Sequence, residues 1–222
     1  CMLSPFASKT GRNQPSNAKF IFGPAKWVRF LIKPEAGKAL AYVDYSQQEF
    51  GIAAALSKDK AMQEAYQSGD PYITFAKQSG AVPDDATPET HPKERNQFKT
   101  CALGTLYGLG PEGMAQKLGQ PVETGRQLLR HHRNCYQGYW KWNHDTVAAA
   151  ILTQEMQTVM GWKMKVPARI SASEGPNMRS LANFPMQANG SEMLRVAVIK
   201  ANELGVEICA TVHDALLIQA PL

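Results

Sequence analysis

The sequence predicts an α+β protein in which a helical middle section is inserted between two parts of one sheet. A short apolar strand is predicted at residues 40–43, helical patterns fill most of the chain from 47 to 203, and two β runs follow near its end. This order of strand, helices and strands differs from the regular alternation that builds a parallel sheet. We therefore expect the helical middle to form its own subdomain.

The composition is that of a globular protein. The chain has 222 residues, of which 44% are hydrophobic and 19% charged, and its formal net charge is +5. These proportions exclude a low-complexity disordered chain. The modest surplus of base is compatible with a phosphate-bearing partner but does not demonstrate one.

Targeting signals are not apparent in the sequence. It has no apolar run of 18 residues and no signal-peptide core at its N-terminus, so no membrane partner is expected. Its four cysteines form no CxxC pair and have no zinc-like spacing. This usage predicts buried thiols in a reduced, cytoplasmic compartment.

Each element follows from its spacing and from the residues that interrupt it. Turn formers and basic residues dominate positions 1–35 before the first strand, and 80–92 is a Pro- and Asp-rich loop. Helices are predicted at 47–67, 72–79, 93–108, 112–118, 123–135, 138–159 and 179–203, a short hairpin at 156–160 and 163–167, and closing strands at 207–212 and 215–219.

Two carboxylates follow predicted strands. Asp44 ends the first apolar strand, and Asp214 lies between the two closing β runs. Taken alone, Asp44 could be a helix N-cap and Asp214 a turn residue. If the strands are neighbours, however, the two carboxylates converge and repel each other, and a divalent cation relieves that repulsion. Such a pair can hold two Mg²⁺ ions about 4 Å apart, an arrangement suited to phosphoryl transfer.

A second pattern combines cations with an aromatic residue. Arg95, Lys99, Leu103 and Tyr107 are spaced four apart, so on a helix they form one strip. Two cations followed by an apolar and an aromatic side chain match the phosphates and base of a nucleotide. The structural alternative is an amphipathic helix with a solvated basic end.

Five segments together resemble the A-family DNA polymerases, the DNA polymerase I-like enzymes. Each segment is weak evidence alone, but their order matches and they cover nearly the whole chain. They are Thr10-Gly11-Arg12, which resembles the segment before motif A; Asp44-Tyr-Ser-Gln-Gln-Glu49, motif A; Arg95-x3-Lys99-x7-Tyr107-Gly108, motif B; Arg179-x3-Asn183-x3-Gln187, the palm helix; and Val212-His213-Asp214, motif C.

The resemblance implies a right-hand polymerase architecture. Palm segments at 1–58 and 176–222, with an antiparallel sheet and flanking helices, would carry motifs A and C. A mostly helical fingers subdomain at 59–175 would carry motif B. Thumb and exonuclease domains would lie outside this chain. Because motifs A and C lie near its two ends and the first residue is Cys, we expect a palm-and-fingers piece that extends primers poorly by itself.

The implied activity is Mg²⁺-dependent transfer of a nucleotide from a dNTP to a primer 3′-OH by a two-metal mechanism. By resemblance, Asp44 and Asp214 ligate two Mg²⁺ ions, for which Mn²⁺ can substitute, and the backbone carbonyl of Tyr45 assists. Lys99 is the candidate general acid for the departing pyrophosphate. The implied partners are dNTPs, primer–template DNA and replication accessory proteins.

The resemblance also assigns binding residues. Glu49 matches the steric gate that excludes a ribose 2′-OH. The implied dNTP-binding residues are Gln47, Glu49, Tyr72, Arg95, Lys99, Leu103 and Tyr107. The implied DNA-binding residues are Arg12, Arg179, Asn183, Gln187 and His213.

Three positions depart from the family pattern. Ala215 replaces the carboxylate that usually follows the motif C aspartate, which predicts weakened or retuned catalysis. Leu103 stands where relatives usually carry Phe or Tyr, so sugar discrimination at the 3′ position is expected to change. Gly51 stands where Arg is common, which removes one contact.

Other functions remain open from the sequence. A non-catalytic primer–template binding module fits Ala215 and the short chain. A single-subunit RNA polymerase shares several of these elements, although Glu49 at the gate argues against it. An unrelated α+β enzyme is the remaining alternative.

Overall fold

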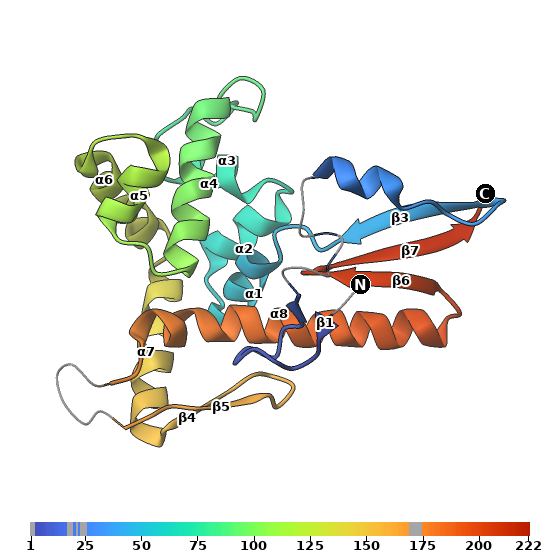
Figure 1. The fold of residues 1–222 in the computed structure, drawn as a ribbon. Coiled ribbons are helices and arrows are strands. Elements are labelled where there is room, and N and C mark those ends of the chain that lie inside the picture. The colour runs from blue at the N-terminus through green and yellow to red at the C-terminus, as the bar shows by residue number, and fades with distance from the viewer. Residues whose placement is uncertain (1–2, 17–19, 21, 23–25, 169–174) are drawn as a thin grey trace. The chain divides into compact units, whose positions relative to one another are not determined.

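The computed structural model describes all residues except 1–2, 17–19, 21, 23–25 and 169–174 (Figure 1). The chain divides into two compact units. Unit 1 contains Cys1–Gln48, Gln157–Met164 and Gln187–Leu222, and unit 2 contains Glu49–Met156 and Lys165–Met186. The predicted α+β class is confirmed, because unit 1 holds an antiparallel sheet and unit 2 is mainly helical.

A three-stranded antiparallel sheet is the centre of unit 1. It consists of β3 (Lys38–Asp44), β6 (Glu207–Val212) and β7 (Ala215–Pro221), in the order β3-β7-β6 (Figure 1). His213 and Asp214 form the two-residue turn between β6 and β7, and His213 adopts a left-handed φ of 56°. The predicted closing hairpin is therefore present.

The first strand was expected to be buried, and this expectation is wrong. Tyr42 and Val43 of β3 are 48% and 52% exposed. The aromatic cover formed by Phe20 and Phe22 packs on Val212 and Leu217 of the other two strands. β3 contributes the partly buried Leu40 to this cluster, but its last residues are exposed.

Smaller elements complete unit 1. β1 (Leu3–Ser4) pairs with β2 (Gln14–Pro15), and a 3₁₀ helix spans Lys26–Leu31. The helix α8 (Met178–Glu203) passes from one unit into the other between Met186 and Gln187. Within unit 1, Leu194 and Val198 of α8 line the same groove as Thr211 of β6.

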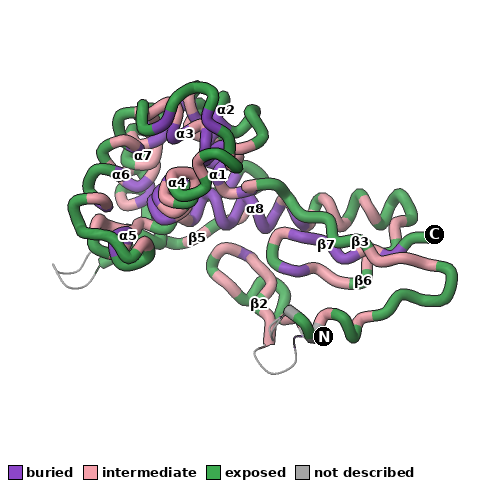
Figure 2. The backbone as a smooth tube through the Cα atoms, turned by 90° about the horizontal axis from the view of Figure 1, so that it is seen from above, coloured by how far each residue is buried: buried purple, intermediate pink, exposed green. Residues whose placement is uncertain are grey.

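Unit 2 is built from helices that pack around α4. Figure 2 shows their buried stretches gathered on the inner sides of the bundle. α4 contacts α3, α5 and α6, and the ring of Phe75 packs edge-on against Phe98 at 4.7 Å. The helices are α1 (Gln48–Ser57), α2 (Lys60–Gln67), α3 (Pro71–Gln78), α4 (Pro92–Leu106), α5 (Pro111–Leu118), α6 (Val122–Cys135) and α7 (Gln137–Thr153).

Two predicted helices differ from the structure. The single helix predicted at 47–67 is two helices, because Lys58 takes a left-handed φ of 54° and the Asp59 carboxylate caps α2 by accepting from the Met62 N–H at 3.0 Å. The helix predicted at 138–159 ends at Thr153, because Gln154 takes a left-handed φ of 56°. β4 (Glu155–Gln157) follows there and pairs with β5 (Lys163–Lys165).

Two further expectations from the sequence concern the burial of the cysteine thiols and membrane-spanning helices. Cys101 is buried, Cys135 is half-buried and Cys209 is exposed, so the expectation of buried thiols holds only for Cys101; Cys1 lies outside the described residues. Within the described parts of the chain, no helix has the length and apolar character to cross a membrane.

Candidate active site

The sheet of unit 1 brings Asp44 and Asp214 together. Asp44 is the last residue of β3 and lies directly opposite Ala215 of β7, so Asp214 is one residue away from Asp44's strand partner. Directly opposite residues of antiparallel strands have Cα atoms about 5 Å apart. The neighbouring strands on which the predicted carboxylate pair depends are therefore present.

The electrostatics of the pair follow from this proximity. The pKa of Asp44 is raised, first by partial removal of its carboxyl from water and then by the negative charge of Asp214. A hydrogen bond from the Tyr45 backbone and the charge of His213 act in the opposite direction. The charge of Asp214 thus disfavours ionisation of Asp44, and a nearby cation would offset this effect.

The donor set suits a hard divalent cation. Within the described part of the chain, no group of three or more His, Cys, Asp or Glu side chains is placed to hold a metal ion. Two carboxylates and a backbone carbonyl are all oxygen donors, which Mg²⁺ and Mn²⁺ prefer, and Mg²⁺ usually takes its remaining ligands from water and substrate phosphates. Asp44, Asp214 and the carbonyl of Tyr45 therefore fit the expected ion.

Three of the predicted DNA-binding residues lie close to one another in unit 1. Arg12 and His213 line one small hollow of about 20 Å³, which is too small for anything larger than water. The Nε of Arg12 donates to the backbone carbonyl of Gln187 at 3.4 Å, and Gln187 itself is buried. Arg12 thus contacts the backbone of Gln187 and lies beside His213.

In unit 2, the predicted cation and aromatic strip lies on α4. Arg95, Lys99 and Leu103 occupy successive turns of the helix, and Tyr107 is its C-cap residue. Lys99 is exposed, Arg95 and Leu103 are half-buried, and Tyr107 is 50% exposed. All four side chains are therefore accessible to a ligand.

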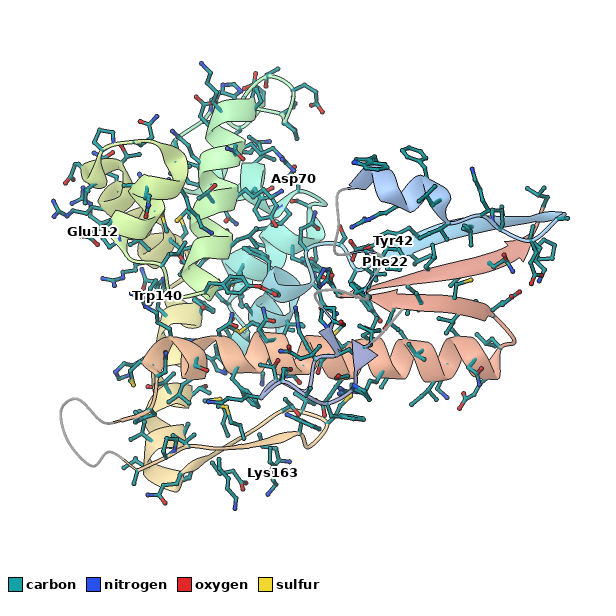
Figure 3. The ribbon with its side chains drawn as sticks, in the orientation of Figure 1. Phe22, Tyr42, Asp70, Glu112, Trp140 and Lys163 are labelled. Carbon is teal, nitrogen blue, oxygen red and sulfur yellow. The ribbon has the colours of Figure 1, made fainter. Side chains whose placement is uncertain are left out.

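The two cations are held by residues of α3 and its N-cap. The Nε of Arg95 donates to the Asp70 carboxylate at 2.5 Å, and Asp70, labelled in Figure 3, also caps α3 by accepting from the Tyr72 N–H. The Arg95 guanidinium lies 5.7 Å and the Lys99 ammonium 5.8 Å from the centre of the Tyr72 ring. The sequence indicated Asp70 only as a helix stop, because its partner is distant in sequence.

The environment of Tyr72 suppresses its ionisation. Its side chain is buried, and desolvation followed by the charge of Asp70 raises the pKa of its phenol to about 12. Tyr72 therefore presents a neutral ring to the two cations at neutral pH.

The candidate gate residue has a direct partner in unit 2. The Oη of Tyr107 donates to Oε1 of Glu49 at 2.7 Å. This bond joins the first turn of α1 to the end of α4 and orients the Glu49 carboxylate. Sequence reasoning missed this bond, because nothing in the spacing links the two positions.

The other two predicted DNA-binding residues belong to unit 2. The Nδ2 of Asn183 donates to the carbonyl of Leu106 at 2.8 Å, at the end of α4. Arg179 packs against Gly108, which has a φ of +69° and where a Cβ would lie 2.9 Å from Cγ of Arg179. A side chain at this position would be strained by the left-handed φ and would displace the side chain of Arg179.

The structure explains one of the departures from the family pattern. A Cβ at Gly51 would lie 2.7 Å from the ring of Tyr66, so this ring occupies the space that a side chain at position 51 needs. Ala215 is fully buried in the sheet. Gln47, the remaining predicted contact, has a left-handed φ of 44° and accepts from the Ser46 hydroxyl at 2.6 Å.

Comparison with solved structures defines the class. The fold is similar to that of the structure described as the POL domain of Pol1 from M. smegmatis, in complex with DNA primer-template and dNTP, with a TM-score of 0.83 and 26% identity. The match covers 99% of this chain and 41% of that one. The fold is that of part of a polymerase domain.

Sequence comparison defines the family. Residues 23–222 match the sequence model of DNA polymerase family A, and the chain belongs to that family. It is 28% identical over 228 residues to a thermostable DNA polymerase I of Thermus thermophilus, covering 97% of this chain and 27% of that protein. It is 27% identical over 196 residues to DNA polymerase I of Deinococcus radiodurans, covering 85% of this chain and 20% of that protein. The chain thus spans about a quarter of the length of these relatives, and the predicted family is confirmed.

Proposed function

We propose that this chain carries the residues for template-directed addition of deoxynucleotides to a primer 3′-OH, as part of a DNA polymerase. The observation that carries the proposal is the proximity of Asp44, at the end of β3, to Asp214, in the turn that leads into the neighbouring strand β7, in a member of DNA polymerase family A. The structural relative in complex with primer-template DNA and dNTP supports the same partners for this chain.

Asp44, Asp214 and the carbonyl of Tyr45 would hold the divalent cation. Bound there, Mg²⁺ would lower the pKa of the primer hydroxyl and neutralise charge on the triphosphate, and a second ion would complete the two-metal arrangement. The protein's own contribution is to hold two carboxylates at neighbouring strand ends.

The α4 strip would bind the triphosphate. The guanidinium of Arg95 can bind phosphate as a fork, and the ammonium of Lys99 can bind it as a point charge. The Lys99 ammonium would also donate a proton to the departing pyrophosphate oxygen. Asp70 and Tyr72 keep both cations on one side of α4 before the ligand arrives.

Glu49 and Tyr107 would select the sugar and support the base. Glu49 would exclude a 2′-OH, and the hydrogen bond from Tyr107 would hold its carboxylate for this role. Leu103 would border the sugar from the preceding turn of α4. Tyr107, half-exposed at the end of the helix, would present its ring to the nascent base pair.

Five polar residues would hold the primer–template end. Hydrogen bonds to acceptors in the minor groove recognise the shape of a base pair without reading the sequence. Within unit 1 these residues are Arg12, Gln187 and His213, and within unit 2 they are Arg179 and Asn183.

Ala215 favours one alternative, a primer–template binding module that does not catalyse. The side chain of Ala215 is a methyl group, so this position adds no carboxylate to the pair. The methyl group is fully buried in the sheet. The alternative predicts DNA binding that falls with salt and no nucleotide incorporation in any divalent metal.

Primer extension tests the proposal. The longest polypeptide that carries this segment is incubated with a labelled primer on a template, one dNTP at a time, and Mg²⁺ or Mn²⁺. Incorporation of only the dNTP complementary to the template is expected. Incorporation of rNTPs at equal efficiency would indicate an RNA polymerase instead, and binding without incorporation would indicate the non-catalytic module.

Metal binding provides a readout that does not depend on activity. Electron paramagnetic resonance of Mn²⁺ titrated with the 222-residue chain should show a bound fraction that Asp44→Asn removes. The matched control is Asp84→Asn, an exposed acid in the loop before α4. Equal Mn²⁺ binding by all three proteins would contradict the assignment.

A further inference from the structure

A short segment of unit 1, between β1 and β2, is held by its backbone carbonyls. Residues 9–12 run beside α8 (Figure 1), and three consecutive carbonyls of this segment each accept a hydrogen bond from a distant side chain. The donors are Nε1 of Trp162 to Lys9 at 3.0 Å, Oγ of Ser191 to Thr10 at 2.9 Å, and the guanidinium of Arg195 to Gly11. We refer to these three side chains as the carbonyl clamp.

Two members of the carbonyl clamp are oriented by aromatic contacts. The rings of Phe6 and Trp162 stack with their centres 5.7 Å apart and an angle of 17° between their planes. The guanidinium of Arg195 lies 4.2 Å from the centre of the Phe6 ring and 5.7 Å from that of Trp162. The indole and the guanidinium therefore restrict each other's positions.

The backbone around Trp162 is in turn fastened to α8. The N–H of Trp162 donates to Oε1 of Glu192 at 3.2 Å, and the N–H of Val159 donates to Oδ1 of Asn189 at 3.1 Å. Glu192 and Asn189 are both buried and lie three residues apart, so they occupy one face of the helix. The same helix thus positions the indole donor and supplies the other two donors.

Gly11 allows the segment to approach the indole closely. Its φ is +71°, and a Cβ at this position would lie 3.1 Å from Cε2 of Trp162. A side chain there would be strained by the left-handed φ and would push against the indole. The close fit of the segment therefore involves Trp162 directly.

The clamped residues immediately precede Arg12, for which we propose a contact with the primer–template end. The Nε of Arg12 donates to the carbonyl of Gln187 at 3.4 Å, which is longer than the usual distance of about 3 Å. Such a contact orients a long, flexible side chain only weakly. The carbonyl clamp fixes the backbone from which this side chain extends.

We propose that Trp162 and Arg195 are positioning residues for primer–template binding, which hold residues 9–11 so that the Arg12 guanidinium meets the minor-groove edge of the DNA. This assignment rests on the proposed function, because it takes the role of Arg12 from there. Neither positioning residue needs to touch DNA itself. Ser191 contributes less, because its single hydroxyl proton is shared with the carbonyl of Ala188 at 2.9 Å.

A double-mutant cycle tests whether Trp162 acts through Arg12. Fluorescence anisotropy measures the Kd for a labelled primer–template, without nucleotide, for the longest polypeptide that carries this segment and for its Trp162→Phe, Arg12→Ala and double variants. Trp162→Phe removes the indole N–H and keeps an aromatic ring. The matched control is Trp27→Phe, at an indole of unit 1 that is 68% exposed and lies outside the clamp. Circular dichroism checks that each variant keeps its helices.

Trp162→Phe should weaken primer–template binding about fivefold, the scale of one hydrogen bond, and Arg12→Ala about tenfold. In the Arg12→Ala background, Trp162→Phe should change the Kd by less than about twofold, because the side chain that it positions is gone. Trp27→Phe should bind like wild type. A fivefold loss in both backgrounds would overturn the proposal, and so would wild-type affinity in Arg12→Ala.

Limited proteolysis examines the carbonyl clamp without DNA. Trypsin can cleave after Lys9 when the backbone there leaves the clamp, and mass spectrometry compares this rate with cleavage after Lys117, an exposed residue in the last turn of α5. Arg195→Gln removes the donor to Gly11 and should raise the relative rate several-fold. Lys200→Gln, which removes the same charge from an exposed position of α8, should leave it unchanged. Unchanged cleavage after Lys9 in Arg195→Gln would contradict the clamp.

Failure of this proposal can be told apart from failure of the proposed function. A wild-type protein that binds primer–template but incorporates no nucleotide would contradict DNA synthesis and leave the positioning role in place. Additive losses from Trp162→Phe and Arg12→Ala, in a protein that extends primers, would leave the proposed function intact and remove only the positioning role.

Discussion

The two units position charged side chains of opposite sign, and they do so by different means. Unit 1 places two carboxylates through strand register, so the backbone of β3 and β7 sets their separation. Unit 2 places two cations on a helix face and holds them through side chains, with Asp70 bound to Arg95 and Tyr72 near both. We infer that the acidic site tolerates little change of register, while the basic site can be adjusted one side chain at a time.

The largest expected effect separates the chemistry of unit 1 from nucleotide binding by unit 2. Asp44→Asn or Asp214→Asn should lower primer extension by about a thousandfold or more, because the remaining carboxylate cannot hold the ions alone. Single-turnover extension measures this rate. Binding of a fluorescent dNTP in the absence of metal should stay within twofold of wild type. Extension that survives either change would remove these residues from the metal site.

A substitution of Lys99 tests the opposite case, in which the chemistry of unit 2 is changed and the acidic pair of unit 1 is left intact. Lys99→Met should slow extension by about a hundredfold, the usual contribution of a positioned general acid. Mn²⁺ binding to the acidic pair should be unchanged, since the variant leaves unit 1 intact. Lys117→Met, at an exposed position of α5, is the matched control. A Lys99 variant with normal extension but weak dNTP binding would limit this residue to binding.

The core of unit 2 should make its stability depend on pH. His132 is fully buried, and desolvation followed by the charge of Arg133 lowers its pKa to about 3. In the folded protein His132 therefore stays uncharged at pH values where the same imidazole in the unfolded chain, with an ordinary pKa of about 6.5, binds a proton. Stability should fall as the pH drops from 7 to 5, by about 2 kcal/mol for this group.

Urea unfolding at both pH values measures this effect in wild type and in His132→Phe. The variant should lose about 2 kcal/mol less than wild type between pH 7 and pH 5, whatever its stability at pH 7. The same dependence in both proteins would show that other groups are responsible.

The smallest expected effect concerns the bond between Glu49 and Tyr107. Tyr107→Phe removes the donor to Glu49 and should raise ribonucleotide incorporation several-fold, because the carboxylate is no longer fixed. Glu49→Ala should raise it further, by about tenfold, which corresponds to about 1.4 kcal/mol of differential binding. Competition between dNTP and rNTP measures both. Unchanged sugar selectivity in Glu49→Ala would remove it from the gate.

The sequence predicted the helices of unit 2 better than the long-range contacts that position their side chains. The four-residue spacing of Arg95, Lys99 and Leu103 is a local signal, because one helix carries all three. Asp70 lies 25 positions before Arg95, and only the packing of α3 on α4 brings them together.

In unit 1 the prediction depended on strand pairing. The closing hairpin was readable from its turn, and the convergence of Asp44 with Asp214 then required only that β3 join it. The exposure of β3 could not be predicted, because Tyr42 and Val43 have the composition of a buried strand. Burial at a sheet edge depends on which distant segments cover it.

Backbone conformation near the acidic pair has a consequence for selection experiments. Gln47 and His213 both take left-handed φ angles, which cost a side-chain-bearing residue about 1 kcal/mol relative to glycine. A library screened only for heat resistance should therefore accumulate Gly or Asn at these two positions. Retention of Gln and His in a library screened for DNA synthesis would show that the chain gives up heat resistance for activity at these two positions.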